Sequence, residues 1–145
     1  NINGFYQEYM NIAQSPDSAP FKPEWIQLHH YDYERRDGQN CLVKKRGEEE
    51  EVIPIEIYCG VDPASSLSSV ADFFVIATIG VDHENNKYIV DMYRKRVSPS
   101  EQPQLIIDTY KKYMPRRVKI ETVAYQEALR VAVRDIMHKQ NIYRC

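Results

Sequence analysis

Three stretches in the middle of the chain show the apolar patterns of β-strands. Residues 53–64, IPIEIYCGVDPA, carry isoleucine at every second position at first, which predicts a strand with one apolar face. Residues 72–81, DFFVIATIGV, form a short apolar run rich in β-branched and aromatic residues, which predicts a buried strand. A polar turn separates that run from residues 87–93, KYIVDMY, so the second and third strands should form an antiparallel hairpin.

The pattern changes to a helical period in the last third of the chain. Apolar residues recur every three or four positions over residues 100–114 and again over residues 125–140, which predicts two amphipathic helices. We expect Ser100 to cap the first helix, because that start places Pro103 in the first turn, where proline is tolerated. Between the helices, residues 117–121, RVKIE, predict a short fourth strand.

The first 52 residues show little periodicity, and three prolines, Pro16, Pro20 and Pro23, interrupt any long helix. We interpret this part as an extended arm that packs over a domain it does not define. The charge block at residues 44–51, KKRGEEEE, is then most simply a solvated loop. The domain proper should comprise residues 53–145.

The predicted order of elements brings two carboxylates together. A helical crossover joins parallel strands, so the strand at 117–121 should run parallel to the strand at 53–64. If these two strands are neighbours, Asp62 and Glu121 meet at the same end of the sheet. Carboxylate oxygens in such a pair suit Mg²⁺ or Mn²⁺, and two such ions can hydrolyse a phosphodiester. Alternatively, Asp62 simply ends a strand, because aspartate is common in turns.

Charge is distributed unevenly along the chain. Residues 1–93 carry a net charge of −9 (7 Lys/Arg, 16 Asp/Glu), whereas residues 94–145 carry +7 (12 Lys/Arg, 5 Asp/Glu). In the last helix, basic residues recur every four positions and form a row that suits the phosphate backbone of DNA; the row comprises Arg130, Arg134 and His138, with Lys139 beside it. The same row would also serve as an ordinary solvated helix surface.

Composition narrows the class of protein further. No run of 18 apolar residues is present, so we expect no membrane span, and no signal peptide is visible. Three cysteines, Cys41, Cys59 and Cys145, form no CxxC pair, which argues against a zinc knuckle or a disulfide scaffold and fits a reducing cytoplasm. The chain lacks an initiator methionine and ends abruptly, so we expect a fragment of a longer protein.

Four segments in this order resemble one known family, the nuclease domain of tailed-phage terminase large subunits, which has a ribonuclease H-like (RuvC-like) fold. The segments are FYQEYMN (5–11) with FKPEWI (21–26), GVDPA (60–64) with Asp72, YIVDMYRKRVSPSE (88–101), and VKIETVAYQEAL (118–129). The resemblance implies an α/β fold with a mixed sheet: strands one to three antiparallel, strand four parallel to strand one, and flanking helices. Residues 1–52 would then be the linker from an ATPase domain, and residues 53–145 a partial nuclease domain.

The resemblance also implies a function, an endonuclease that cuts concatemeric double-stranded phage DNA during packaging with two divalent metal ions. Asp62 matches the catalytic aspartate of the first strand, and Glu121 matches the acid after the fourth. Asp72 matches a recurring acid whose role, metal ligand or support of the loop, stays open. Implied partners are the terminase small subunit and the portal protein, in the cytoplasm of an infected or lysogenic bacterium.

The sequence departs from the family pattern in two ways. The third catalytic acid of the family lies beyond a fifth strand that this chain lacks, and no GxxxxGK[ST] loop of an ATPase is present. The edge of the fourth strand would be left open, and we expect weak or no activity from this chain alone. Two other interpretations remain: another ribonuclease H-like nuclease, of the resolvase or transposase type, and a non-catalytic module that docks nucleic acid or protein.

Overall fold

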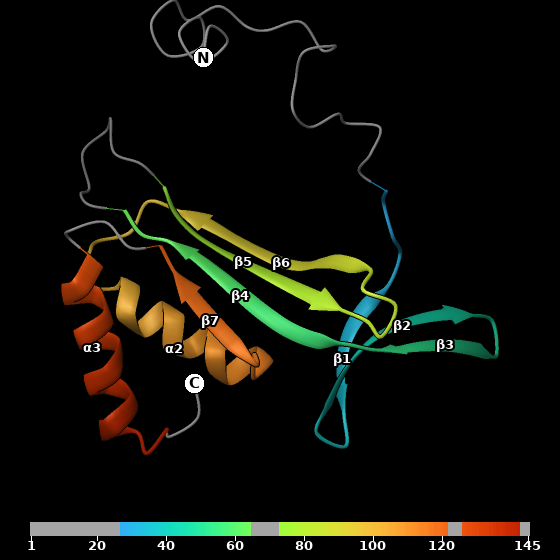
Figure 1. Cartoon of the computed structure of the whole chain (residues 1–145). Coiled ribbons are helices and arrows are strands. Elements are labelled where there is room, and N and C mark those ends of the chain that lie inside the picture. Colours follow the sequence, from blue (N-terminus) through green and yellow to red (C-terminus); the bar gives the residue numbers. More distant parts are fainter. Residues whose placement is uncertain (1–26, 65–72, 122–125, 143–145) are drawn as a thin grey trace, which may run out of the picture. The chain divides into compact units, whose positions relative to one another are not determined.

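The structure, a computed structural model, describes residues 27–64, 73–121 and 126–142 (Figure 1). The chain divides into two compact units, Asn1–His30 and Tyr31–Cys145, and every element below belongs to the second unit. The amino-terminal segments 5–11 and 21–26, and also Asp72, lie outside the described residues.

A four-stranded mixed sheet forms the centre of the second unit. Its strands are β4 (Glu56–Asp62), β5 (Phe74–Val81), β6 (Lys87–Lys95) and β7 (Arg117–Ile120), and their order is β6-β5-β4-β7. β5 pairs antiparallel with both β4 and β6, whereas β7 pairs in parallel with β4, as a helical crossover requires. The expected α/β class with mixed strand directions is therefore confirmed.

Two helices, α2 (Gln102–Tyr113) and α3 (Gln126–Lys139), pack against the inward residues of this sheet and against each other (Figure 1). Side chains alternate between the two faces of a strand, so one face of β4 can be fully buried while the other stays open. The core joins the buried residues of the strands to those of the helices, and includes Ile57, Cys59, Val61, Phe74, Ile76, Ile106, Ile107, Leu129 and Val133.

The start of α2 corrects one expectation. Ser100 does not cap the helix; the N-cap is Glu101, and it makes no side-chain cap hydrogen bond. Instead the Glu101 carboxylate reaches back and accepts a 2.9 Å hydrogen bond from the backbone N–H of Ser98. Pro103 does lie in the first turn, where its missing N–H costs no helical bond.

The expectation of an extended arm and a solvated loop is wrong for the residues just before the central sheet. They form a three-stranded antiparallel sheet of β1 (Asp32–Arg36), β2 (Gln39–Arg46) and β3 (Glu49–Pro54). Opposite charges face each other across β2 and β3, since Lys44 pairs with Glu51 and Arg46 with Glu49. Such cross-strand pairs stabilise a sheet even where its side chains are polar. The proposed link to an ATPase domain stays a prediction.

The stretch read as one strand from residue 53 is in fact two strands. β3 ends at Pro54 and β4 begins at Glu56, and the buried Ile55 between them donates its N–H to the Asn40 carbonyl at 2.9 Å. Proline cannot donate to a strand ladder, so Pro54 is a natural end for β3. The chain thereby passes from one sheet to the other within a single residue.

Candidate active site

The two predicted acids lie at neighbouring strand ends. β4 ends at Asp62, and its preceding residue Val61 pairs with Ile120, the last residue of β7. The backbone N–H of Glu121 donates to the Val61 carbonyl at 2.9 Å, so the pairing continues one residue past β7. Adjacent strands lie about 4.8 Å apart. The structure therefore brings Asp62 and Glu121 side by side.

Both carboxylates belong to the sheet face opposite the helices. Along β4 exposure alternates, with Ile57, Cys59 and Val61 buried and with Gly60 and Asp62 exposed. On β7, Val118 and Ile120 are half-buried towards the helices, whereas the residues between and after them are exposed. An open hollow of about 590 Å³ lies on the exposed face and is lined by Gly60, Val61, Asp62, Val75, Ala77, Lys119 and Glu121.

Small residues form the floor of this hollow. Gly60 of β4 pairs with Ala77 of β5 on one side and with Lys119 of β7 on the other. A Cβ built on Gly60 would meet no atom of the described residues within 4 Å, so none of these residues fills the space above the strand there. A hydrated cation or a phosphate group could enter the hollow and reach both carboxylates.

The chemistry of the two donors fits a hard divalent cation. Asp62 and Glu121 offer carboxylate oxygens on an exposed surface, and Mg²⁺ or Mn²⁺ is commonly held by one or two carboxylates plus water and substrate oxygens. Within the ranges 27–64, 73–121 and 126–142, no group of three or more His, Cys, Asp or Glu side chains is placed to hold a metal. The pair thus supplies a partial ligand set, and Asp72 lies outside the described residues.

Cys59 lies on β4 close to this site but has a different environment. Its side chain points into the core, and its Sγ lies 3.7 Å from Oγ1 of Thr78. Burial raises the pKa of the Cys59 thiol, and the contact with Thr78 opposes this only in part. A thiol with a raised pKa is a poor nucleophile, so Cys59 serves as a core residue, in agreement with its place in the strand pattern.

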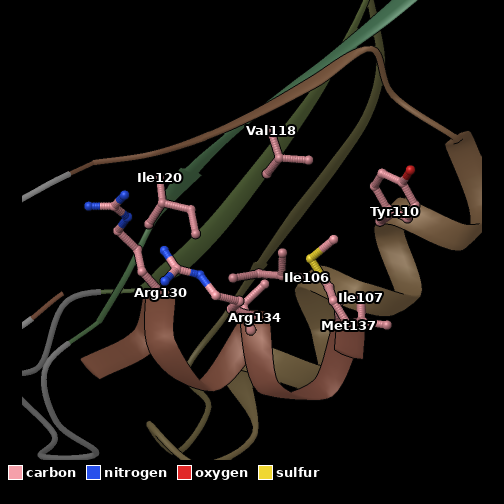
Figure 2. Close-up of a pocket in the computed structure, with 9 residues that line it drawn as sticks. Ile106, Ile107, Tyr110, Val118, Ile120, Arg130, Arg134 and Met137 are labelled. Carbon is pink, nitrogen blue, oxygen red and sulfur yellow. The ribbon is translucent and has the colours of Figure 1, made fainter. Parts of the chain in front are cut away.

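The predicted basic row lies elsewhere. Arg130, Arg134, His138 and Lys139 are all exposed on α3, and Arg130 forms a 3.0 Å ion pair with Glu127. Figure 2 shows the guanidinium groups of Arg130 and Arg134 extending from α3 on the side where Ile120 lies. They line an apolar groove of about 260 Å³ between α2, β7 and α3.

This groove and the acidic hollow occupy opposite faces of β7. Val118 and Ile120 line the groove, whereas Lys119 and Glu121 line the hollow. The structure therefore does not place the basic row in the same cavity as the carboxylates. Its role in DNA binding stays a prediction.

One residue of the hollow escaped the sequence analysis. Lys119 precedes Glu121 by two positions, and that spacing places both residues on the same face of a strand. The alternation in RVKIE indicates this shared face, but it does not indicate that a hollow lies there.

A comparison with family models assigns the chain to a protein family. Residues 59–141 match the model described as a terminase RNaseH-like domain, and this match covers more than half of the sequence and includes both acids. The chain therefore belongs to the terminase RNaseH-like domain family, as the resemblance in the sequence indicated, and is a nuclease-type terminase module. No curated protein and no solved structure matches it. In the described part of the chain, no helix is long and apolar enough to span a membrane.

Proposed function

We propose that this chain is the metal-dependent DNA endonuclease domain of a phage packaging terminase large subunit, which cuts concatemeric DNA. One observation carries the proposal: Asp62 and Glu121 stand side by side at parallel strand ends above an open hollow. Membership of the terminase RNaseH-like family supports it, because two neighbouring carboxylates suit the metal-dependent chemistry of a ribonuclease H-like nuclease.

Asp62 and Glu121 would hold two divalent ions, Mg²⁺ or Mn²⁺, together with oxygens from water and the DNA phosphate. When bound, such ions supply an activated water and stabilise the leaving oxygen of a phosphodiester. Backbone pairing fixes the positions of the two strand ends, and no described residue fills the space above Gly60 where the phosphate would lie. Rigid strand ends suit this task better than loops.

The remaining parts of the proposal concern the setting of the domain. Double-stranded DNA is the substrate, and Arg130, Arg134, His138 and Lys139 would contact its backbone away from the hollow. The terminase small subunit and the portal protein would be its partners in the cytoplasm of the bacterial host. Asp72 would either complete the metal site or support the loop before β5.

A non-catalytic docking module is the second candidate. It is favoured by the small number of ligands, since the described residues contain no cluster of three metal-binding side chains. In such a module Asp62 and Glu121 would be ordinary solvated strand ends. A resolvase-type or transposase-type nuclease would use the same two acids, so the substrate would separate it from a terminase.

Incubation of the purified chain with supercoiled plasmid and Mn²⁺, with and without chelator, tests the proposal. Asp62→Ala and Glu121→Ala should each abolish metal-dependent cleavage. Asp108→Ala, which removes an exposed acid on α2, should leave cleavage unchanged. Calorimetric titration with Mn²⁺ provides a second measurement, because binding should weaken in the first two variants only. If the wild-type chain neither cleaves the plasmid nor binds Mn²⁺, the result favours the docking module.

A further inference from the structure

We propose that Lys119 contacts the phosphate that is cut, from within the same hollow as the two acids; this inference rests on the nuclease function proposed above. Lys119 would hold the negative phosphate over the small floor residues Gly60 and Ala77 while Asp62 and Glu121 face the same group. It would therefore be a substrate-binding residue of the site, distinct from the basic row of α3.

The strand register fixes where Lys119 lies. It pairs with Gly60, and Asp62 and Glu121 form the next row of the same face. Successive residues on one face of a strand are about 6.6 Å apart, which a lysine side chain easily spans. The absence of a side chain at Gly60 leaves the path from Lys119 to the hollow clear.

Two other cations near the sheet are already engaged by protein groups. Arg116 holds both oxygens of the Glu56 carboxylate at 2.6 and 2.7 Å. Arg94 lies two strands from Asp62 in the same row, and its guanidinium carbon is 3.4 Å from the centroid of the Phe73 ring. Among the described residues, no carboxylate lies within ion-pair distance of Lys119, even though Glu121 is on the same strand face.

An exposed lysine that forms no ion pair with a described residue adds little to fold stability, so its charge is available to a ligand. A phosphodiester brings negative charge to a site that is already acidic, and a nearby ammonium group offsets the repulsion. Lysine binds phosphate as a mobile point charge, so it can follow the phosphate as the geometry changes. The position of Lys119 in the hollow suits this role.

Arg117 provides a matched control. It lies on the same strand and the same face as Lys119, is also exposed and carries the same charge, but it pairs with Tyr58 and does not line the hollow. Loss of either residue removes one positive charge from β7. Only the loss of Lys119 removes a charge from the hollow.

The test compares Lys119→Ala, Lys119→Arg and Arg117→Ala with Asp62→Ala in Mn²⁺-dependent plasmid cleavage at saturating DNA. We expect Lys119→Ala to slow cleavage at least about tenfold, Lys119→Arg to restore part of the rate, and Arg117→Ala to stay within about twofold of wild type. In the presence of chelator, the logarithm of the DNA-binding constant should fall less steeply with the logarithm of the salt concentration in Lys119→Ala. The slope should decrease by about 1, as expected for the loss of one phosphate contact. Unfolding curves check that all variants fold.

The outcomes separate this inference from the proposed function. If Asp62→Ala abolishes cleavage while Lys119→Ala behaves like Arg117→Ala, the role of Lys119 is refuted and the nuclease stands. If Asp62→Ala cleaves like wild type, the proposed function itself fails. If the wild-type chain does not cleave, an unchanged salt dependence in Lys119→Ala still overturns the contact.

Discussion

The side-chain amide of Gln102 donates a 2.7 Å hydrogen bond to the backbone carbonyl of Ala64, two residues beyond Asp62. Both residues are only 1% exposed, so this bond is shielded from water. It ties the first turn of α2 to the segment in which β4 ends. The position of Asp62 thus depends on a residue forty positions away that carries no charge.

We predict that Gln102→Leu weakens both stability and cleavage. The substitution keeps the volume of the side chain but leaves the buried Ala64 carbonyl without its donor, which costs about 1–3 kcal/mol. Urea denaturation measures the loss of unfolding free energy, and plasmid cleavage reports the displacement of Asp62. Gln104→Leu, at an exposed position of the same helix, is the control and should change neither. Equal stability of the two variants would show that the bond does not matter.

The hydrogen bond between Tyr113 and Asp91 predicts a dependence of stability on pH. The Tyr113 hydroxyl donates to the Asp91 carboxylate at 2.6 Å, and this bond, with the nearby charge of Lys112, holds the pKa of Asp91 below its ordinary value. Because the folded pKa is lowered, the stabilisation is present above the unfolded pKa of about 3.9 and is lost as the pH falls through the folded value.

Replacement of Asp91 by Asn should therefore cost stability near pH 6 and cost progressively less towards pH 3. Asp91 is about half exposed (45%), so we expect only about 1 kcal/mol at pH 6. Urea unfolding of wild type and Asp91→Asn over this range measures the difference. A difference that grows as the pH falls would contradict the assignment. Asp108→Asn, on the exposed face of α2, provides the baseline.

Two glycines in neighbouring strands should respond differently to a methyl group. A Cβ on Gly80 of β5 would lie 2.6 Å from Cδ1 of the buried Ile55 and 3.2 Å from Cγ2 of Val90, whereas a Cβ on Gly60 would meet no atom of the described residues within 4 Å. Gly80→Ala overpacks the core and should cost about 1–2 kcal/mol, because Ile55 must move. Thermal unfolding of Gly80→Ala and Gly60→Ala tests this, and equal melting temperatures would refute it.

Asn40 connects the amino-terminal sheet to the helical side of the domain. Its Nδ2 donates to the Tyr113 carbonyl at 3.1 Å, and its Oδ1 accepts from the Tyr33 hydroxyl at 2.8 Å. Asn40→Ala removes both bonds at a buried position and should cost about 2–3 kcal/mol. Denaturation followed by tyrosine fluorescence and by circular dichroism should show coincident transitions in the wild type. Lys111→Ala, an exposed change on α2, should be neutral.

The elements from β4 onward were predictable because their apolar periodicity follows their burial. The strand that ends at Asp62 and the helices near 100–114 and 125–140 all follow that rule. The amino-terminal sheet was missed because half of the residues of β3 are charged and find their partners on β2, where no single-chain pattern shows them. Its best signal was the dipeptide Asp37-Gly38, whose positive φ angles of 49° and 83° form the turn between β1 and β2.

The candidate site was only partly accessible from the sequence. The topology argument led to the neighbouring positions of Asp62 and Glu121, because a crossover connection restricts the strand order. The two-residue spacing of Lys119 and Glu121 already indicates a shared strand face. The sequence could not show that α3 packs on the other face of β7, which leaves Arg130 and Arg134 beside the apolar groove and away from the acids.

The hydrogen bond from the Glu121 N–H to the Val61 carbonyl has a further consequence. The distance between the two acids is set there by peptide groups, which are the same for every amino acid except proline. Substitutions at positions 61, 118 or 120 that keep the strands paired would alter the packing beneath the site but not the spacing above it. The chain can therefore accept many sequence changes over evolution without losing the geometry that its acidic pair requires.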